Sequence, residues 1–209
     1  MEESAAPLWI EPTQQRSREK VERMLDAALA MASEQGSLDL KMTEVAVRAG
    51  VAVGTLYQFF PSRTGLIAAL FAREMAPIDA SIDQLFDGSR AEGTLAERIE
   101  LLMNEQVELV RSRPGLSVIW AGASVDPVIE SADLENTRKN AARLTENMKA
   151  LLPGRSDSGA LAATALLICH LWGSVIRLCV LCAEEETAML ITQYAALIAA
   201  RAAEFTNER

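Results

Sequence analysis

Residues 43 to 63, TEVAVRAGVAVGTLYQFFPSR, predict two short helices joined by a tight turn. Thr43 can cap the first helix, whose apolar stripe begins at Val45. Gly50 ends this helix, and a second one follows over about 53 to 60. Two short helices joined by a glycine-containing turn are the sequence form of a helix-turn-helix, in which the second helix enters the DNA major groove.

Packing divides the positions of this unit into internal and outward ones. Because the two helices must approach closely, we expect four small or apolar residues inside, namely Ala46, Gly50, Val51 and Leu56. The residues left to face DNA or solvent are Val53, Gly54, Thr55, Tyr57, Gln58 and Phe59. A glycine such as Gly54 costs a helix about 1 kcal/mol relative to alanine. A close approach to DNA would account for that cost, and a spare glycine in a frayed helix is the alternative.

This stretch closely resembles the DNA-binding segment of the TetR family of bacterial transcription regulators. The matching residues are Thr43, Val45-Ala46, Ala49-Gly50-Val51, Gly54-Thr55-Leu56-Tyr57, Phe60, Ser62, Arg63 and Leu66. The match is specific because it fixes residue types through the whole unit and into the following helix. The resemblance implies that Thr43 and Tyr57 contact phosphates, that Arg63 replaces the family's lysine at a phosphate, and that residues 53 to 58 face bases.

Two positions depart from the family pattern. Ala52 replaces the usual serine, so the second helix loses a side-chain N-cap, and Phe59 replaces a histidine or tyrosine, which removes a polar contact. Neither change disturbs the packing positions. The candidate DNA-binding residues are Arg16, Arg18, Thr43, Arg48, Val53, Gly54, Thr55, Tyr57, Gln58, Phe59, Ser62 and Arg63.

Charge is distributed unevenly along the chain. The formal net charge of -9 argues against a general nucleic-acid binder, which would be basic. Residues 41 to 73, however, hold four basic side chains against one acidic one, and further basic residues lie between 16 and 23. This pattern fits a protein that docks one face on phosphates. For Lys41 and Arg73, a solvated helix face is the favoured interpretation.

The remaining sequence predicts an all-α protein. The resemblance implies that it has an N-terminal three-helix DNA-binding head and a C-terminal helical ligand-binding and dimerisation bundle. Half of the 209 residues are apolar, only 5% are aromatic, and no period-2 alternation is sustained. We expect a mobile arm at 1–15, the helix-turn-helix domain at 16–61, a connecting helix at 62–77, and an effector-binding and dimerisation domain at 78–205.

Local signals mark the ends of several helices. Gly36 should end the first long helix, and Ser62 is a plausible N-cap for the connecting helix. Pro77 should kink or interrupt that helix. Thr94 and Glu97 form a capping box.

Residues 159 to 183 are almost continuously apolar, which would permit a transmembrane helix by length. Arg177 near the middle and the absence of an aromatic belt favour a buried or dimer-interface helix instead. The three cysteines, Cys169, Cys179 and Cys182, read as small buried hydrophobes rather than as disulfide or metal ligands. With no signal peptide at the N-terminus, we expect a cytoplasmic protein.

The resemblance implies a homodimer through the last two helices, and therefore a palindromic double-stranded DNA operator. It also implies a repressor released by a small, hydrophobic effector. Candidate effector-binding residues are Met103, Trp120, Met148, His170, Trp172 and Arg177. His170 and Arg177 share a helical face and could hold a carboxylate. A hydrogen-bonded core histidine and an arginine paired to glutamate at the dimer seam are the alternatives.

Two other functions are alternatives to a regulator. An enzyme is disfavoured because the chain has one histidine, no G-x-S-x-G elbow, no glycine-rich phosphate loop and no metal-ligand spacing. We therefore expect no catalytic residues, metal or cofactor. The alternative kept open is a protein-interaction adaptor that retains the helix-turn-helix head but not specific DNA binding.

Overall fold

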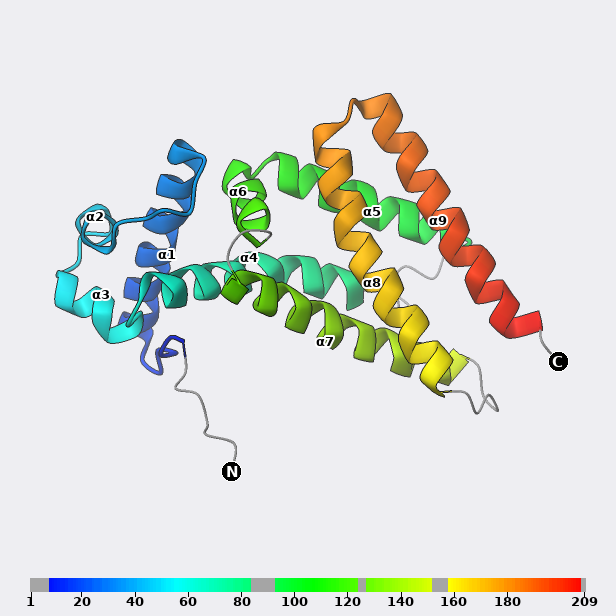
Figure 1. Ribbon diagram of the computed structural model, residues 1–209, viewed down its shortest axis with the longest axis horizontal. Helices are drawn as coiled ribbons and strands as arrows, with labels where there is room; N and C mark the ends of the chain where they lie inside the picture. Colours follow the sequence, from blue (N-terminus) through cyan, green and yellow to red (C-terminus); the bar gives the residue numbers. More distant parts are fainter. Residues whose placement is uncertain (1–7, 84–92, 124–126, 152–157, 208–209) are drawn as a thin grey trace. The chain divides into compact units, whose positions relative to one another are not determined.

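The computed structural model describes residues 8–83, 93–123, 127–151 and 158–207, and every regular element in those ranges is helical (Figure 1). This confirms the all-α class. The helices are α1 (Gln15–Gln35), α2 (Met42–Arg48), α3 (Val53–Phe59), α4 (Arg63–Asp83), α5 (Leu95–Arg111), α6 (Pro114–Ala123), α7 (Pro127–Leu151), α8 (Ser158–Leu181) and α9 (Glu184–Asn207).

These helices belong to two compact units. The head unit comprises residues 1–76 and 113–132, and the body unit comprises 77–112 and 133–209. The head unit therefore holds α1 to α3, most of α4, and α6. The functional division expected from the sequence, with its boundaries after 15, 61 and 77, stays a prediction.

The head unit is built on the apolar face of α1. Its buried side chains recur at helical spacing, and they are Val21, Met24, Leu25, Ala27, Ala28, Met31 and Ala32. The helix ends at Gly36, whose φ of 61° is left-handed, as the sequence predicted. Helix α6 packs closely on α1, because a Cβ at Gly115 would overlap the side chain of Leu29.

The connecting helix α4 runs without interruption through Pro77. Of the predicted kink or interruption, the interruption is absent, since one missing N–H removes a single bond of the helical ladder, and the kink stays a prediction. The boundary between the two units nevertheless falls between Ala76 and Pro77. The start of α4 is capped as expected, because the Ser62 Oγ accepts a hydrogen bond from the Gly65 amide at 3.0 Å.

The body unit packs α5, α8 and α9 against one another (Figure 1). The Thr94–Glu97 capping box at the start of α5 is formed in both directions. Buried polar groups join the helices: Trp172 Nε1 donates to Gln106 Oε1 at 2.7 Å, and the Tyr194 hydroxyl donates to the Ile168 carbonyl at 2.6 Å.

Helix α8 is mostly uncovered within one chain rather than internal. Over Gly159–Leu181 it is long and apolar enough to cross a membrane, and only 22% of its most apolar window is buried within the chain. Its exposed face carries large apolar side chains, among them Leu167, Leu171 and Leu178. The described residues of one chain leave this face uncovered.

Candidate DNA-binding face

Helices α2 and α3 form a helix-turn-helix around Gly50. This glycine has a φ of 66°, and the Val51 amide beyond it donates to the Ala46 carbonyl at 3.0 Å. Gly50 is exposed, so the prediction that it lies inside is wrong. Its role is to supply the left-handed conformation that other residues rarely adopt.

The start of α2 differs from the expected cap. The N-cap position is Lys41, which makes no side-chain capping bond, and Thr43 lies exposed in the first helical turn. The prediction that Thr43 caps α2 is therefore wrong. The exposed hydroxyl of Thr43, in the first turn of α2, suits contact with an anion.

One face of α3 is open to solvent. Val53, Gly54, Tyr57 and Gln58 are exposed along it, and Thr55 is half-buried at its edge. No atom other than those of its own helix and chain neighbours lies within 4 Å of the position that a Cβ at Gly54 would take. The N-cap Ala52 makes no side-chain hydrogen bond, as expected from the missing serine.

Phe59 does not belong to this open face. Its side chain is only 9% exposed, beside the fully buried Leu56 and Phe60. The prediction that Phe59 faces DNA or solvent is wrong, because a residue three positions after Leu56 lies on the same side of a helix. The aromatic ring thus joins the core of the head unit.

Three of the four candidate cations around this face, Arg18, Arg48 and Arg63, already have acidic or carbonyl partners. Arg48 binds both carboxylate oxygens of Glu34, at 2.6 and 2.5 Å, and this bonding holds the pKa of Glu34 below its usual range. Arg63 pairs with Asp39. The Arg18 guanidinium donates to backbone carbonyls of residues 12 and 13, and Arg16 is exposed at the start of α1.

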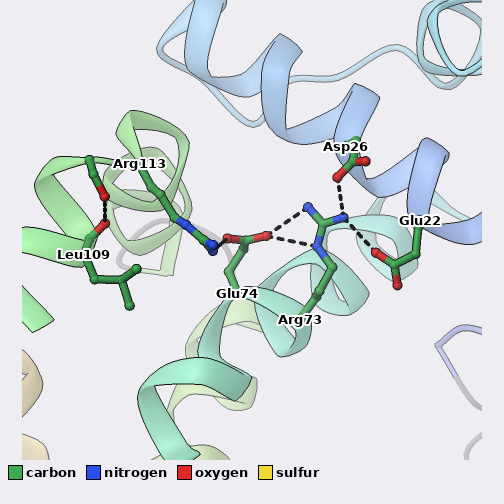
Figure 2. Close-up of polar contacts among 7 residues, drawn as sticks. Glu22, Asp26, Arg73, Glu74, Leu109 and Arg113 are labelled. Atoms are coloured by element: carbon green, nitrogen blue, oxygen red, sulfur yellow. Dashed lines mark hydrogen bonds and ion pairs between the residues drawn. The ribbon is translucent and has the colours of Figure 1, made fainter. Parts of the chain in front are cut away.

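The head unit contains a buried carboxylate that the sequence does not indicate. Glu74 is 3% exposed, and its two oxygens bind Arg73 at 2.9 Å and Arg113 at 3.0 Å (Figure 2). Arg73 also reaches Glu22 and Asp26 on α1, at 3.2 and 2.8 Å. The expectation of a merely solvated Arg73 is therefore wrong, because its guanidinium ties α1 to α4. Nothing in the local sequence around Glu74 signals that it is buried.

The structure distributes the effector candidates over both units. Trp120 lies in the head unit, where its Nε1 donates to the Met75 sulfur at 3.3 Å. The others lie in the body unit: Met103 and Trp172 are buried, Met148 and Arg177 are half-buried, and His170 is exposed.

The proposed anion-binding pair of α8 faces an acid of its own chain. The charges of Arg177 and His170 both lower the pKa of Asp133, while burial raises it more strongly, so that the net shift is upward. Arg177 also donates to Ser174 Oγ at 3.1 Å. A ligand carboxylate at this pair would therefore compete with Asp133.

The cysteines are free thiols, with Cys179 buried and the other two half-buried. Burial raises the pKa of Cys169 to about 11. Such thiols stay protonated at neutral pH, which agrees with their interpretation as small apolar side chains.

Two family models match the chain. Residues 24–70 match "Bacterial regulatory proteins, tetR family", and residues 93–203 match "Tetracyclin repressor-like, C-terminal domain". The first covers the helix-turn-helix and the second covers α5 to most of α9. Together they account for both units.

Curated relatives and solved structures agree with this assignment. The HTH-type transcriptional repressor KstR of Mycolicibacterium smegmatis is 38% identical over 108 residues, which is 52% of either chain. The KstR of Mycobacterium tuberculosis is 36% identical over 52% of this chain and 48% of its own. The chain thus spans about half the length of the curated relatives it matches.

The likeness to solved structures extends over most of the chain. A TetR-family transcriptional regulator from Streptomyces coelicolor has a TM-score of 0.61 at 25% identity, covering 88% of this chain and 99% of that one. One from Syntrophomonas wolfei has a TM-score of 0.67 at 17% identity, covering 88% and 96%, and shows the shared fold. By its family models, its relatives and its fold, the chain belongs to the TetR family of bacterial transcription regulators.

Proposed function

We propose that this chain is a non-enzymatic, cytoplasmic transcription regulator that binds an operator as a homodimer. It acts as a repressor, and a small hydrophobic effector releases it from the operator. The observation that carries the DNA-binding part is the open face of α3. It presents an apolar side chain, a glycine, a phenol and an amide on one side of a helix-turn-helix, with Leu56 buried behind them.

The chemistry of that face suits a major groove. Gln58 can pair with an adenine edge through its amide, Val53 can contact a thymine methyl group, and the Tyr57 hydroxyl can donate to a phosphate. Gly54 leaves room for the DNA backbone or a base edge to approach. The exposed Thr43 at the start of α2 would hold a second phosphate.

The dimer part is supported by the exposed apolar side chains of the last two helices. On α8, Leu167, Leu171 and Leu178 are between 47% and 62% exposed, and on α9 Met189 and Leu197 are 58% and 68% exposed. A second copy packed on α8 and α9 would bury this surface, and its two-fold symmetry would place two recognition helices on a palindromic operator. A Leu171→Glu variant should be monomeric in analytical ultracentrifugation.

The effector part rests on the apolar character of the body unit. Met103 is fully buried, and Met148 is half-buried, so these flexible side chains are placed to adapt to an apolar ligand. Release follows if the effector binds the DNA-free conformation more tightly than the DNA-bound one. The repressor names of the KstR relatives support the direction of control.

The decisive experiment titrates the purified protein onto labelled DNA from its own upstream region, at two salt concentrations, beside scrambled DNA. A Tyr57→Ala variant serves as the control. Specific binding that survives higher salt and is lost in the variant would establish the regulator.

Equal, weak binding to both DNAs would call for selection from a random DNA pool, because the operator could lie elsewhere. A pool that yields no preferred sequence would overturn the proposal in favour of the adaptor. The exposed α3 face would then have to recognise protein.

A further inference from the structure

Residues 8–14, which precede α1, are attached to the recognition helix α3. The Ile10 amide donates to the Phe59 carbonyl at 2.9 Å. The same segment is attached to α1, because Arg18 Nη2 donates to the Thr13 carbonyl at 3.1 Å. This segment, called the brace below, therefore joins the start of α1 to the end of α3.

The Ile10 amide supplies a hydrogen-bond donor at the C-terminus of α3. The last four carbonyls of a helix have no partner within the helix, and Phe59 is the last residue of α3. With seven residues, α3 is far shorter than a helix that is stable alone. An outside donor at Phe59 therefore fixes the end of the helix that presents Tyr57 and Gln58.

Gly65 supplies a second, independent observation. It lies in the first turn of α4, where its amide already binds Ser62 Oγ at 3.0 Å. A Cβ at this position would overlap the carbonyl oxygen of Leu8 and lie 3.1 Å from its carbon. Because Gly65 has no Cβ, the carbonyl of Leu8 can pack against it. This contact accounts for a glycine at a helical position, where glycine otherwise weakens a helix.

The brace has no basic side chain that could pair with a phosphate. Residues 8–14 contain one charged side chain, Glu11, and no lysine or arginine. Glu11 would be repelled by DNA phosphates whatever the DNA sequence. We therefore assign a favourable effect of the brace to its contact with α3.

We propose that the brace is a positioning element for the recognition helix, with the Ile10 amide capping α3 at Phe59 and Gly65 admitting the Leu8 carbonyl. The proposal rests on the proposed DNA-binding function. It assigns a role in operator discrimination to residues outside the helix-turn-helix, none of which touches DNA.

The first test needs no DNA. Amide hydrogen exchange of the full chain, followed by NMR, should show the Ile10 amide protected in the parent protein and unprotected in Gly65→Ala. A Gly173→Ala variant is the matched control, because a Cβ at Gly173 meets only the Arg177 guanidinium at an ordinary 3.5 Å. An unprotected Ile10 amide in the parent protein would refute the brace, whatever the protein does with DNA.

The second test compares two substitutions of one residue. Ile10→Pro removes the amide donor, whereas Ile10→Ala keeps it and shortens a side chain that is 50% exposed. Loss of one hydrogen bond should weaken operator binding about three- to tenfold in Ile10→Pro and leave Ile10→Ala near the parent value. The parent protein, Ile10→Pro and Ile10→Ala should bind scrambled DNA with the same affinity, since the phosphate contacts remain. A general loss of folding would instead lower the affinity for scrambled DNA as well.

A double-variant cycle completes the design. Gly65→Ala should weaken operator binding in the full chain but have no effect in a chain that begins at Glu11, where no Leu8 carbonyl remains. An equal loss in both backgrounds, or tighter operator binding after removal of residues 1–10, would overturn the proposal. If the parent protein selects no DNA sequence at all while its Ile10 amide is protected, it is the proposed function that fails, and the brace stands as a structural feature of the head unit.

Discussion

Arg113 donates to the carboxylate of Glu74 at 3.0 Å, and that carboxylate is almost completely removed from solvent (Figure 2). The bond joins the residue just before α6 to Glu74, near the end of the part of α4 that belongs to the head unit. Because Arg73 holds the other carboxylate oxygen, two guanidiniums share one buried negative charge. Removing one partner of a buried ion pair is strongly destabilising, because the other charge is left uncompensated.

Replacement of Glu74 by glutamine should therefore destabilise the chain strongly. The change leaves Arg113 without its carboxylate partner and Arg73 with only the exposed Glu22 and Asp26. Removing the buried member of such an ion pair costs about 3 kcal/mol of unfolding free energy. Asp26→Asn is the matched control, because Asp26 binds the same Arg73 but its side chain is 71% exposed, and we expect a loss below about 0.5 kcal/mol. Urea unfolding measures both, and similar losses in the two variants would contradict a special role of the buried acid.

Gln58→Ala should change which operator bases are preferred. Loss of an amide that reads a base edge costs about 1–3 kcal/mol at one base pair and little elsewhere. Tyr57→Ala should instead weaken binding to all sequences, because a phosphate contact carries no sequence information. Binding to a library of operator variants separates the two patterns, and a uniform loss for Gln58→Ala would remove Gln58 from base readout.

Glu34→Gln should strengthen binding to DNA of any sequence. Arg48 is held by both Glu34 oxygens, so a phosphate contact by Arg48 requires that this ion pair be broken. Without the carboxylate we expect a severalfold gain in affinity that is largest at low salt. Glu19→Gln removes the same charge from the same helix without releasing Arg48, and an equal gain there would mean that only net charge matters.

Acid should weaken the N-terminus of α5. The Thr94 amide and hydroxyl donate to the Glu97 carboxylate and lower its pKa. The capping box therefore contributes fully to the unfolding free energy at neutral pH, above the usual carboxyl pKa. That contribution is lost as the pH falls through the lowered pKa of Glu97. Thr94→Ala should lower the unfolding free energy by about 1 kcal/mol at neutral pH. Urea unfolding should show a smaller difference between variant and parent in acid, and a difference independent of pH would contradict the capping role of Glu97.

Several helix ends were predictable from local capping chemistry, although the Thr43 cap of α2 was not among them. Gly36 ends α1 in a left-handed conformation, Thr94 and Glu97 form their capping box, and Ser62 caps α4, all from chemistry within four residues. The outward side of α3 was harder to assign. A seven-residue helix has fewer than two turns, so its apolar positions fit more than one orientation, and Phe59 was assigned to the wrong side.

Partners distant in sequence were beyond prediction. Arg48 and Glu34 lie 14 residues apart, and Arg113 and Glu74 lie 39 apart, so only the packed fold brings their charges together. The same holds for the brace. The Ile10 amide meets Phe59 across the whole of α1 and α2, and no periodicity in the sequence reports it.

Because the Phe59 side chain is buried, few side chains of α3 are left to contact operator bases. With that ring in the core, Gln58 is the one exposed side chain of α3 that can exchange two hydrogen bonds with a single base. Each half-site would then be specified in detail at few base pairs. The remaining selectivity would come from the flexibility and groove width of the intervening DNA. Operators of this protein should therefore share these physical properties at positions where their base sequence varies.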